Sequence, residues 1–161
     1  MSFEKLQCLF PVAVLLHNAE EGIEFPAWWL RHANQIPFHP TPIMARTALA
    51  ALTLAAFGVT YLSRRMGKQS VSAYLLFGAI ITMLANVFIP HIPASLKFRE
   101  YTPGIVTAVF INLPLMSVLA IRAVREGWVS GRKAVLYGIA VPVLLAASIG
   151  VLLLAAARYL A

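Results

Sequence analysis

The 161-residue chain contains no aspartate and only one cysteine, and just 12% of its residues are charged. A single cysteine excludes an internal disulfide and any zinc site built from cysteines. Soluble domains carry about twice this share of charged residues, roughly a quarter of the chain. Hydrophobic residues make up 60% of the sequence and the mean hydropathy is +0.79. The composition therefore indicates an integral membrane protein with no room for a separate soluble domain.

Basic residues outnumber acidic ones, with 13 lysines and arginines against six glutamates. In a soluble protein this excess would point to nucleic acid, but here the basic residues lie between apolar runs, where they set membrane topology. We therefore expect no nucleic-acid partner. The expected partners are membrane lipids and a hydrophobic small-molecule substrate. A face of small residues in the segment 42–62 would suit packing within the chain or a homo-oligomer equally well.

A spanning helix needs about 20 mostly apolar residues, and five segments meet this length, the first of them only if its glutamate stretch is included. The expected fold is all-α, a polytopic membrane helix bundle that forms one domain over residues 1–161. The expected helices are about 6–25, 42–62, 71–89, 103–123 and 135–157. Pro26 is expected to stop the first helix and Pro90 the third. The first helix resembles a signal peptide in its apolar half, but we expect it to stay uncleaved because no clear cleavage site follows.

The orientation of the bundle follows from the positions of lysine and arginine. With five spans, the N-terminus, the connection between helices two and three, and that between helices four and five share one side. That side carries eight lysines and arginines, and the opposite side carries five. The positive-inside rule then predicts a cytoplasmic N-terminus. The expected location is the cytoplasmic membrane of a bacterium.

Half of the acidic residues follow His17 at the end of the first apolar run, as Glu20, Glu21 and Glu24. Residues three and four apart share a helix face, so these four side chains form a stripe about 100° wide. Ionisable groups within a membrane are costly and indicate a functional site. One chemistry is binding of a divalent metal, zinc, iron or manganese. The other is metal-free, with a protonated glutamate as general acid. The structural alternative is a solvated helix end, above all for Glu24.

Further polar residues are expected at the same end of the bundle as the glutamates. Asn86 and His91 close the third helix, and Tyr101 precedes the fourth, where Thr102 is expected as N-cap and Pro103 as the first helical residue. Groups that converge on one end of a bundle can form a site between helices. Interhelical hydrogen bonds or a solvated loop would explain the same residues structurally.

Three other polar features are left open by the sequence. Arg46 enters the second helix from the same side, either as a counter-ion to the glutamates or with its side chain reaching the headgroups. Asn112 either reaches the same cavity or pairs with a neighbour. His32 and His39 lie in the first connection, where most residues are solvated, and either of them could join the site.

Three motifs occur in order, and together they resemble the HXXEE family of small membrane proteins. They are His17-Asn-Ala-Glu20-Glu21, Asn86 followed by His91, and Tyr101-Thr-Pro-Gly104. The resemblance covers the chain from His17 to Gly104 at least. It implies an integral membrane protein of a kind thought to be enzymes, with no established reaction.

The leading functional hypothesis is a metal-dependent membrane enzyme that hydrolyses a lipid or another hydrophobic substrate at the extracytoplasmic face. The expected metal ligands are His17, Glu20, Glu21, Glu24 and His91. The expected catalytic residues are His17, Glu20, Glu21, Asn86, His91 and Tyr101, with Asn86 and Tyr101 orienting substrate or water.

Two alternatives from other classes stay open. A metal-free isomerase or cyclase of a lipid-like substrate would use His17 and Glu21 for acid–base chemistry. A transporter would use the glutamates as a cation or proton site. Against a transporter, the apolar run Leu6–Leu16 brings no charge into the other half of the first helix.

Overall fold

The computed structural model describes the backbone of residues 1–35 and 41–159, and the side chains of these residues up to 148 and at 151. Every regular element in these ranges is a helix, which confirms the all-α prediction. The α-helices are α1 Phe3–Leu6, α2 Leu9–Arg31, α3 Pro42–Met66, α4 Val71–Asn86, α5 Ile92–Phe98, α6 Ile105–Thr107, α7 Leu113–Arg125 and α8 Gly131–Tyr159. The segment Val87–His91 joins α4 to α5 across a kink, and a π-helical segment, Ala108–Asn112, joins α6 to α7.

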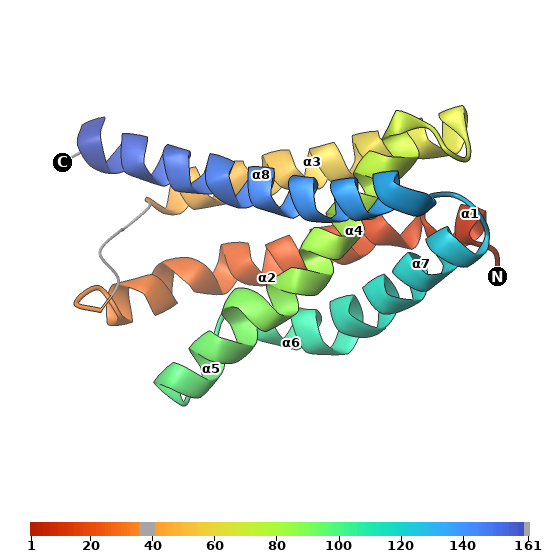
Figure 1. Cartoon of the computed structure of the whole chain (residues 1–161). Helices are drawn as coiled ribbons and strands as arrows, with labels where there is room; N and C mark the ends of the chain where they lie inside the picture. Colours follow the sequence, from red (N-terminus) through yellow and green to blue (C-terminus); the bar gives the residue numbers. More distant parts are fainter. Residues whose placement is uncertain (36–40, 160–161) are drawn as a thin grey trace.

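The helices form a bundle in which the chain runs from end to end (Figure 1). The N-terminus and α1 lie at one end with the α3–α4 and α7–α8 connections, while the last turns of α2 and α8 lie at the other. Buried side chains of α1, α2, α4 and α7 form the hydrophobic core, among them Phe3, Phe10, Leu76 and Met116. This arrangement matches the five-helix topology expected from the sequence.

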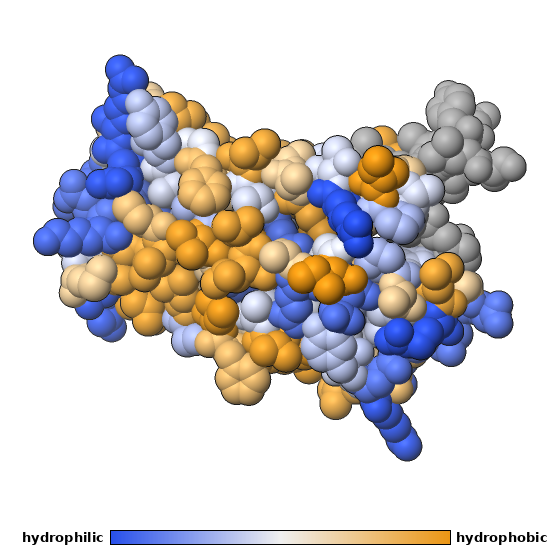
Figure 2. Space-filling model, turned by 180° about the vertical axis from the view of Figure 1, so that it is seen from behind, coloured by the Kyte–Doolittle hydropathy of each residue, from blue (hydrophilic) through white to orange (hydrophobic). Residues whose placement is uncertain are grey.

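Within the part of the chain that the structure describes, four helical segments are long and apolar enough to cross a membrane, as expected of an integral membrane protein. They are Pro42–Met66, Val71–Phe98, Ile105–Arg125 and Gly131–Ser148. The remaining long helix, α2, has 23 residues and carries the three glutamates. A broad apolar surface lies between hydrophilic groups at the two ends of the bundle (Figure 2).

Helix α2 does not stop at Pro26, in contrast to the prediction. It continues to Arg31, so ten helical residues follow Glu21. Proline has no N–H to donate to the carbonyl four residues earlier, which would leave the Gly22 carbonyl without its helical partner. Arg46 of α3 supplies that partner, because its Nε donates to the Gly22 oxygen at 3.0 Å. The glutamates therefore lie near the middle of α2 rather than at its end, and Arg46 binds backbone.

This contact predicts that Pro26 and Arg46 are energetically coupled. Arg46→Met should destabilise the protein by about 1 kcal/mol, because the Gly22 carbonyl loses its donor. In a Pro26→Ala background the restored N–H can take that role, so the same substitution should cost clearly less. Thermal unfolding of the four proteins in one detergent measures the coupling. Equal losses in both backgrounds would contradict this explanation of the continuous helix.

The third expected helix is broken and then resumes. Helix α4 ends at Asn86, and Ile89 has an extended backbone (φ −147°, ψ 107°). Pro90 follows, and the chain is helical again in α5, from Ile92 to Phe98. The expected stop near Pro90 is therefore a break within a longer helical segment. It places His91 in the interior, where only 3% of the residue is exposed.

The fourth helical segment begins at Ile105, two residues later than predicted. Gly104, with φ +84°, is its N-cap, whereas Thr102 donates its hydroxyl to the His91 carbonyl at 3.4 Å. The predicted capping role of Thr102 is therefore wrong. The other long helices extend beyond their expected limits, since α3 continues to Met66 and α8 begins at Gly131.

Candidate metal site

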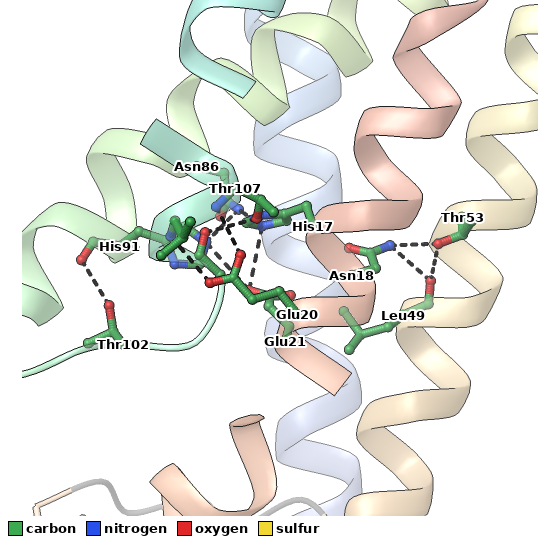
Figure 3. A network of polar contacts seen from close by, with 12 residues as sticks. His17, Asn18, Glu20, Glu21, Leu49, Thr53, Asn86, His91, Thr102 and Thr107 are labelled. Atoms are coloured by element: carbon green, nitrogen blue, oxygen red, sulfur yellow. Dashed lines mark hydrogen bonds and ion pairs between the residues drawn. The ribbon is translucent and has the colours of Figure 1, made fainter. Parts of the chain in front are cut away.

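Three side chains that could hold a metal ion come together inside the bundle: His17, Glu21 and His91. One donor atom from each lies within 4.8 Å of the others. The Glu21 Oε1 atom is 3.7 Å from His17 Nε2 and 3.4 Å from His91 Nε2. Both imidazoles are almost fully buried, and the Glu21 side chain is 14% exposed. Figure 3 shows the three side chains converging from α2 and from the α4–α5 break.

The local sequence explains how these groups meet. His17 and Glu21 are four residues apart on α2, so their side chains lie on one helix face. His91 lies two residues after Ile89, where extended backbone interrupts the third helical segment. The two imidazole rings then meet edge to face, with centroids 4.9 Å apart and an interplanar angle of 89°.

Thr107 fixes the orientation of the His17 ring. The His17 Nδ1 atom lies 2.9 Å from Thr107 Oγ1, and that hydroxyl donates to the Gly104 carbonyl at 3.2 Å. Because the hydroxyl proton is used on Gly104, the hydroxyl oxygen accepts from His17 Nδ1–H. The Nε2 atom of His17, which lies beside Glu21, is then unprotonated, as a metal ligand requires.

Asn86 lies between the two imidazoles. Its Nδ2 atom is 3.0 Å from His17 Nε2 and 3.0 Å from His91 Nε2. An amide NH₂ group has two protons, one for each ring nitrogen. Both Nε2 atoms therefore act as acceptors toward the same amide nitrogen. The expected grouping of Asn86 with His91 is present in the structure.

Gly104 packs closely against all three side chains of the cluster. A side-chain carbon at this position would lie 2.7 Å from His91 Cε1, 2.9 Å from His17 Cε1 and 3.0 Å from Glu21 Cγ. These separations are shorter than van der Waals contact, and the positive φ is itself costly for residues other than glycine. Glycine thus allows the backbone to contact all three members of the cluster.

Glu20 serves a neighbouring contact rather than the three-residue cluster. Its carboxylate accepts hydrogen bonds from the Tyr101 hydroxyl at 2.7 Å and from the backbone N–H groups of Val106 at 3.2 Å and Thr107 at 2.9 Å. A carboxylate at free helix N–H groups is a favourable arrangement. Glu20 therefore joins α2 to the start of the fourth segment and holds Thr107 in position beside His17.

Tyr101 lies at the edge of this contact, outside the membrane-spanning segments. Burial and the hydrogen bond to the Glu20 carboxylate raise the pKa of its hydroxyl. The group therefore stays protonated at neutral pH and donates to Glu20. In this arrangement Tyr101 is a donor to a carboxylate and not a base.

Other residues expected at the site lie elsewhere. Glu24 is exposed and is not part of the metal-competent group found among the described residues. His32 lies at the end of α2, where its Nε2 atom is 3.3 Å from Glu100 Oε1 and its ring packs against Phe98. His39 lies outside the described residues.

The surroundings of three further residues could not be predicted from the sequence. Thr107 was not expected at the site, although it lies one turn after Gly104. Asn18, inside the His17–Glu21 motif, donates to the Leu49 carbonyl at 3.0 Å and to Thr53 at 2.8 Å, so it anchors α2 to α3. Asn112 is fully buried, and neither amide atom has a hydrogen-bond partner among the side chains and backbone described.

The role of Thr107 can be tested by removing only its hydroxyl. Thr107→Val keeps the shape but leaves His17 Nδ1–H without an acceptor, so the ring loses its fixed orientation. Loss of such a supporting contact typically weakens metal affinity about 10- to 100-fold. Thr107→Ser keeps the hydroxyl and should bind zinc nearly as wild type does. A competition titration with a zinc-chelating dye distinguishes the two variants, and equal affinities in both would contradict the assigned orientation.

Comparison with known proteins agrees with the motif pattern. The profile of the HXXEE family, described as a protein of unknown function with HXXEE motif, matches residues 8–120. The chain is also similar to the uncharacterized protein YrkK of Bacillus subtilis (strain 168), with 27% identity over 149 residues. That alignment covers 89% of this chain and 90% of YrkK. No solved structure matches the chain significantly.

Proposed function

Because the chain belongs to the HXXEE family, for which no function is established, we propose a function from the geometry of its buried cluster. We propose that the protein is a membrane-embedded enzyme that uses a divalent metal held by His17, Glu21 and His91. The observation that carries this proposal is that one donor atom from each of the two imidazoles and the carboxylate lies within 4.8 Å of the others.

The spacing of the donor atoms supports the proposal. Ligands of a tetrahedral zinc ion at about 2.0–2.1 Å lie roughly 3.3 Å from one another. The Glu21 oxygen lies 3.4 and 3.7 Å from the two ring nitrogens. These two distances are close to that separation, and all three donors lie within 4.8 Å of one another. The donor set, two histidines and one carboxylate, suits zinc, and also suits iron or manganese.

A three-ligand set favours catalysis over a purely structural role. Structural zinc sites have four protein ligands, whereas catalytic sites have three and leave a position for water or substrate. A metal bound in this way activates water and polarises a carbonyl or phosphoryl oxygen, which is the chemistry of hydrolysis. Hydrolysis is therefore the reaction we propose.

The residues of the chain divide into ligands and supporting groups. His17, Glu21 and His91 are the ligands, and Thr107 orients His17. Asn86 contacts both ring nitrogens in the structure. When the metal binds these nitrogens, the Asn86 amide would turn away from them and orient a water or substrate oxygen. Glu20 has both carboxylate oxygens occupied by hydrogen bonds, so we assign it to positioning and not to proton transfer.

A hydrophobic substrate fits the surroundings of the site. Exposed apolar residues such as Val106 and Phe110 lie just after Gly104 in the chain. A lipid or another apolar molecule in the bilayer would meet these residues beside the site. With a cytoplasmic N-terminus, the proposed site belongs to the extracytoplasmic half of the membrane.

One observation favours a metal-free acid–base enzyme as the second candidate. The Asn86 amide satisfies both imidazole nitrogens without an ion. His17 and Glu21 would then protonate and deprotonate a lipid-like substrate, as in an isomerase or cyclase. In the metal enzyme, the Asn86 amide must instead turn away from the ring nitrogens.

The two candidates are separated by chelation. Purified protein is incubated with a bacterial lipid extract, and the products are identified by mass spectrometry before and after removal of metal. The metal enzyme should lose lipid turnover with the chelator and regain it with zinc, iron or manganese, and Glu21→Gln should remain inactive after metal addition. Turnover that survives full removal of metal would contradict the metal enzyme and support the acid–base candidate.

A further inference from the structure

A separate groove is lined by residues from the start of α2 and the end of α3. These two segments lie at the end of the bundle that holds the N-terminus (Figure 1). It has a volume of about 430 Å³. Arg64, Arg65 and Tyr61 line its outer part, and Phe57 and Pro11 line its apolar part. None of these residues belongs to the proposed metal site, so the groove needs an explanation of its own.

The lining residues change from apolar to basic along the helix axis. Phe57, Tyr61 and Arg64 follow one face of α3 at spacings of four and three residues. Seven residues of helix separate Phe57 from Arg64, a rise of about 10 Å. The headgroup region on each side of a bilayer is roughly 5–7 Å thick. When the arginines in the last turn reach the headgroups, Phe57 therefore lies among the acyl chains.

The polar end of the groove is suited to a phosphate. Arginine guanidinium groups bind phosphate oxygens through pairs of hydrogen bonds. Arg65 Nη1 lies 3.4 Å from the Tyr61 hydroxyl, which keeps this guanidinium over the groove. Glu4 forms part of the opposite wall, so two positive charges face one negative charge. The remaining charge is positive, and a ligand with a net negative charge would complement it.

We infer that this groove binds an anionic membrane phospholipid. The phosphate lies at Arg64 and Arg65, and an acyl chain follows Phe57 and Pro11. A zwitterionic lipid fits less well, because its ammonium group would enter a groove that already carries positive charge. This inference goes beyond the proposed enzymatic function and does not depend on it, since the two sites share no residue.

Native mass spectrometry of the detergent-purified full chain tests the inference. The protein is mixed with equal amounts of phosphatidylglycerol and phosphatidylcholine, and retained lipids are counted. Wild type should retain one phosphatidylglycerol in preference. Arg64→Gln/Arg65→Gln should lower that retention about thirtyfold, since each of the two basic residues near a membrane surface contributes on the order of 1 kcal/mol. Glu4→Gln should raise it.

The matched control is Arg125→Gln/Lys133→Gln. It removes two positive charges from exposed positions at the same end of the bundle but outside the groove. This variant should retain phosphatidylglycerol as wild type does. Arg64→Lys/Arg65→Lys, which keeps the charge, should retain more lipid than the glutamine variant and shows whether the substituted chain still folds.

Three results would overturn the inference. The first is equal retention of phosphatidylglycerol and phosphatidylcholine by wild type. The second is an equal loss in the control variant, which would indicate general surface charge. The third is displacement of the lipid by soluble glycerol phosphate at matched concentration, which would indicate an anion site without a role for the acyl chain.

Discussion

Replacing His91 with alanine is expected to weaken zinc binding by more than about a hundredfold. Supporting residues alone contribute about 10- to 100-fold to metal affinity, and His91 is proposed as a direct ligand. The substitution leaves only two ligands, His17 and Glu21, to hold the ion. Competition with a chelating dye in detergent solution measures the affinity, and thermal unfolding without metal shows whether the chain remains folded.

The matched control for this prediction is His32→Ala. His32 is also a buried histidine beside a carboxylate, with Nε2 3.3 Å from Glu100 Oε1, but it lies at the end of α2. Zinc affinity should stay within about twofold of wild type, because substitutions at distant independent sites have little mutual effect. A similar loss in both variants, or an unchanged affinity in His91→Ala, would be inconsistent with His91 as a ligand.

The second large effect is expected for Gly104→Ala. The added carbon would lie 2.7 Å from His91 Cε1 and 2.9 Å from His17 Cε1, so both rings or the backbone must move. The positive φ adds about 1–2 kcal/mol of strain. We expect a fall in stability together with a loss of zinc affinity of at least about tenfold, because a ligand set depends on geometry held within about 0.5 Å.

Gly127→Ala separates the effect of backbone strain on stability from the effect of the added carbon on zinc affinity. Gly127 also has a positive φ, +71°, but a side-chain carbon there meets nothing within 4 Å. This variant should show the loss of stability from backbone strain and retain wild-type zinc affinity. If Gly104→Ala lost stability to the same extent and still bound zinc normally, Gly104 would be a turn residue without a role at the site.

Much of the fold and part of the site follow from the sequence because they depend on local pattern. Apolar length predicts the long helices, and helical spacing predicts that His17 and Glu21 share a face. The acidic stripe of the first predicted helix and His91 at the end of the third fall at the same end of the bundle. The sequence therefore also predicts that His91 joins the site. These inferences need only the period of a helix and the cost of ionisable groups among apolar residues.

The remaining features depend on contacts between distant segments. Pro26 predicts the end of a helix. In the structure, Arg46 of another helix supplies the missing donor to the Gly22 carbonyl, and the helix continues. Glu20 and Glu21 are adjacent, and spacing alone does not assign one to a helix N-terminus and the other to the histidines. The two glutamates differ in role because the segment that begins at Gly104 packs against α2 and brings its backbone N–H groups to Glu20.

The same limit applies to Gly104 and Thr107. A glycine before a helix is common, so its sequence position indicates only a turn. Its second role, the close approach to His17, His91 and Glu21, appears only when α2, the α4–α5 break and the fourth segment are assembled. Thr107 likewise becomes an orienting residue only through a contact that spans 90 residues.

X-ray absorption spectroscopy of the zinc-loaded protein tests the central claim most directly. The account predicts one zinc per chain, bound by nitrogen and oxygen at about 2.0–2.1 Å, with the outer-shell scattering of two imidazoles. In His91→Ala, half of the imidazole signal should disappear together with the tight binding. A protein that takes up no zinc, or whose zinc shows no imidazole scattering, would contradict the proposed site.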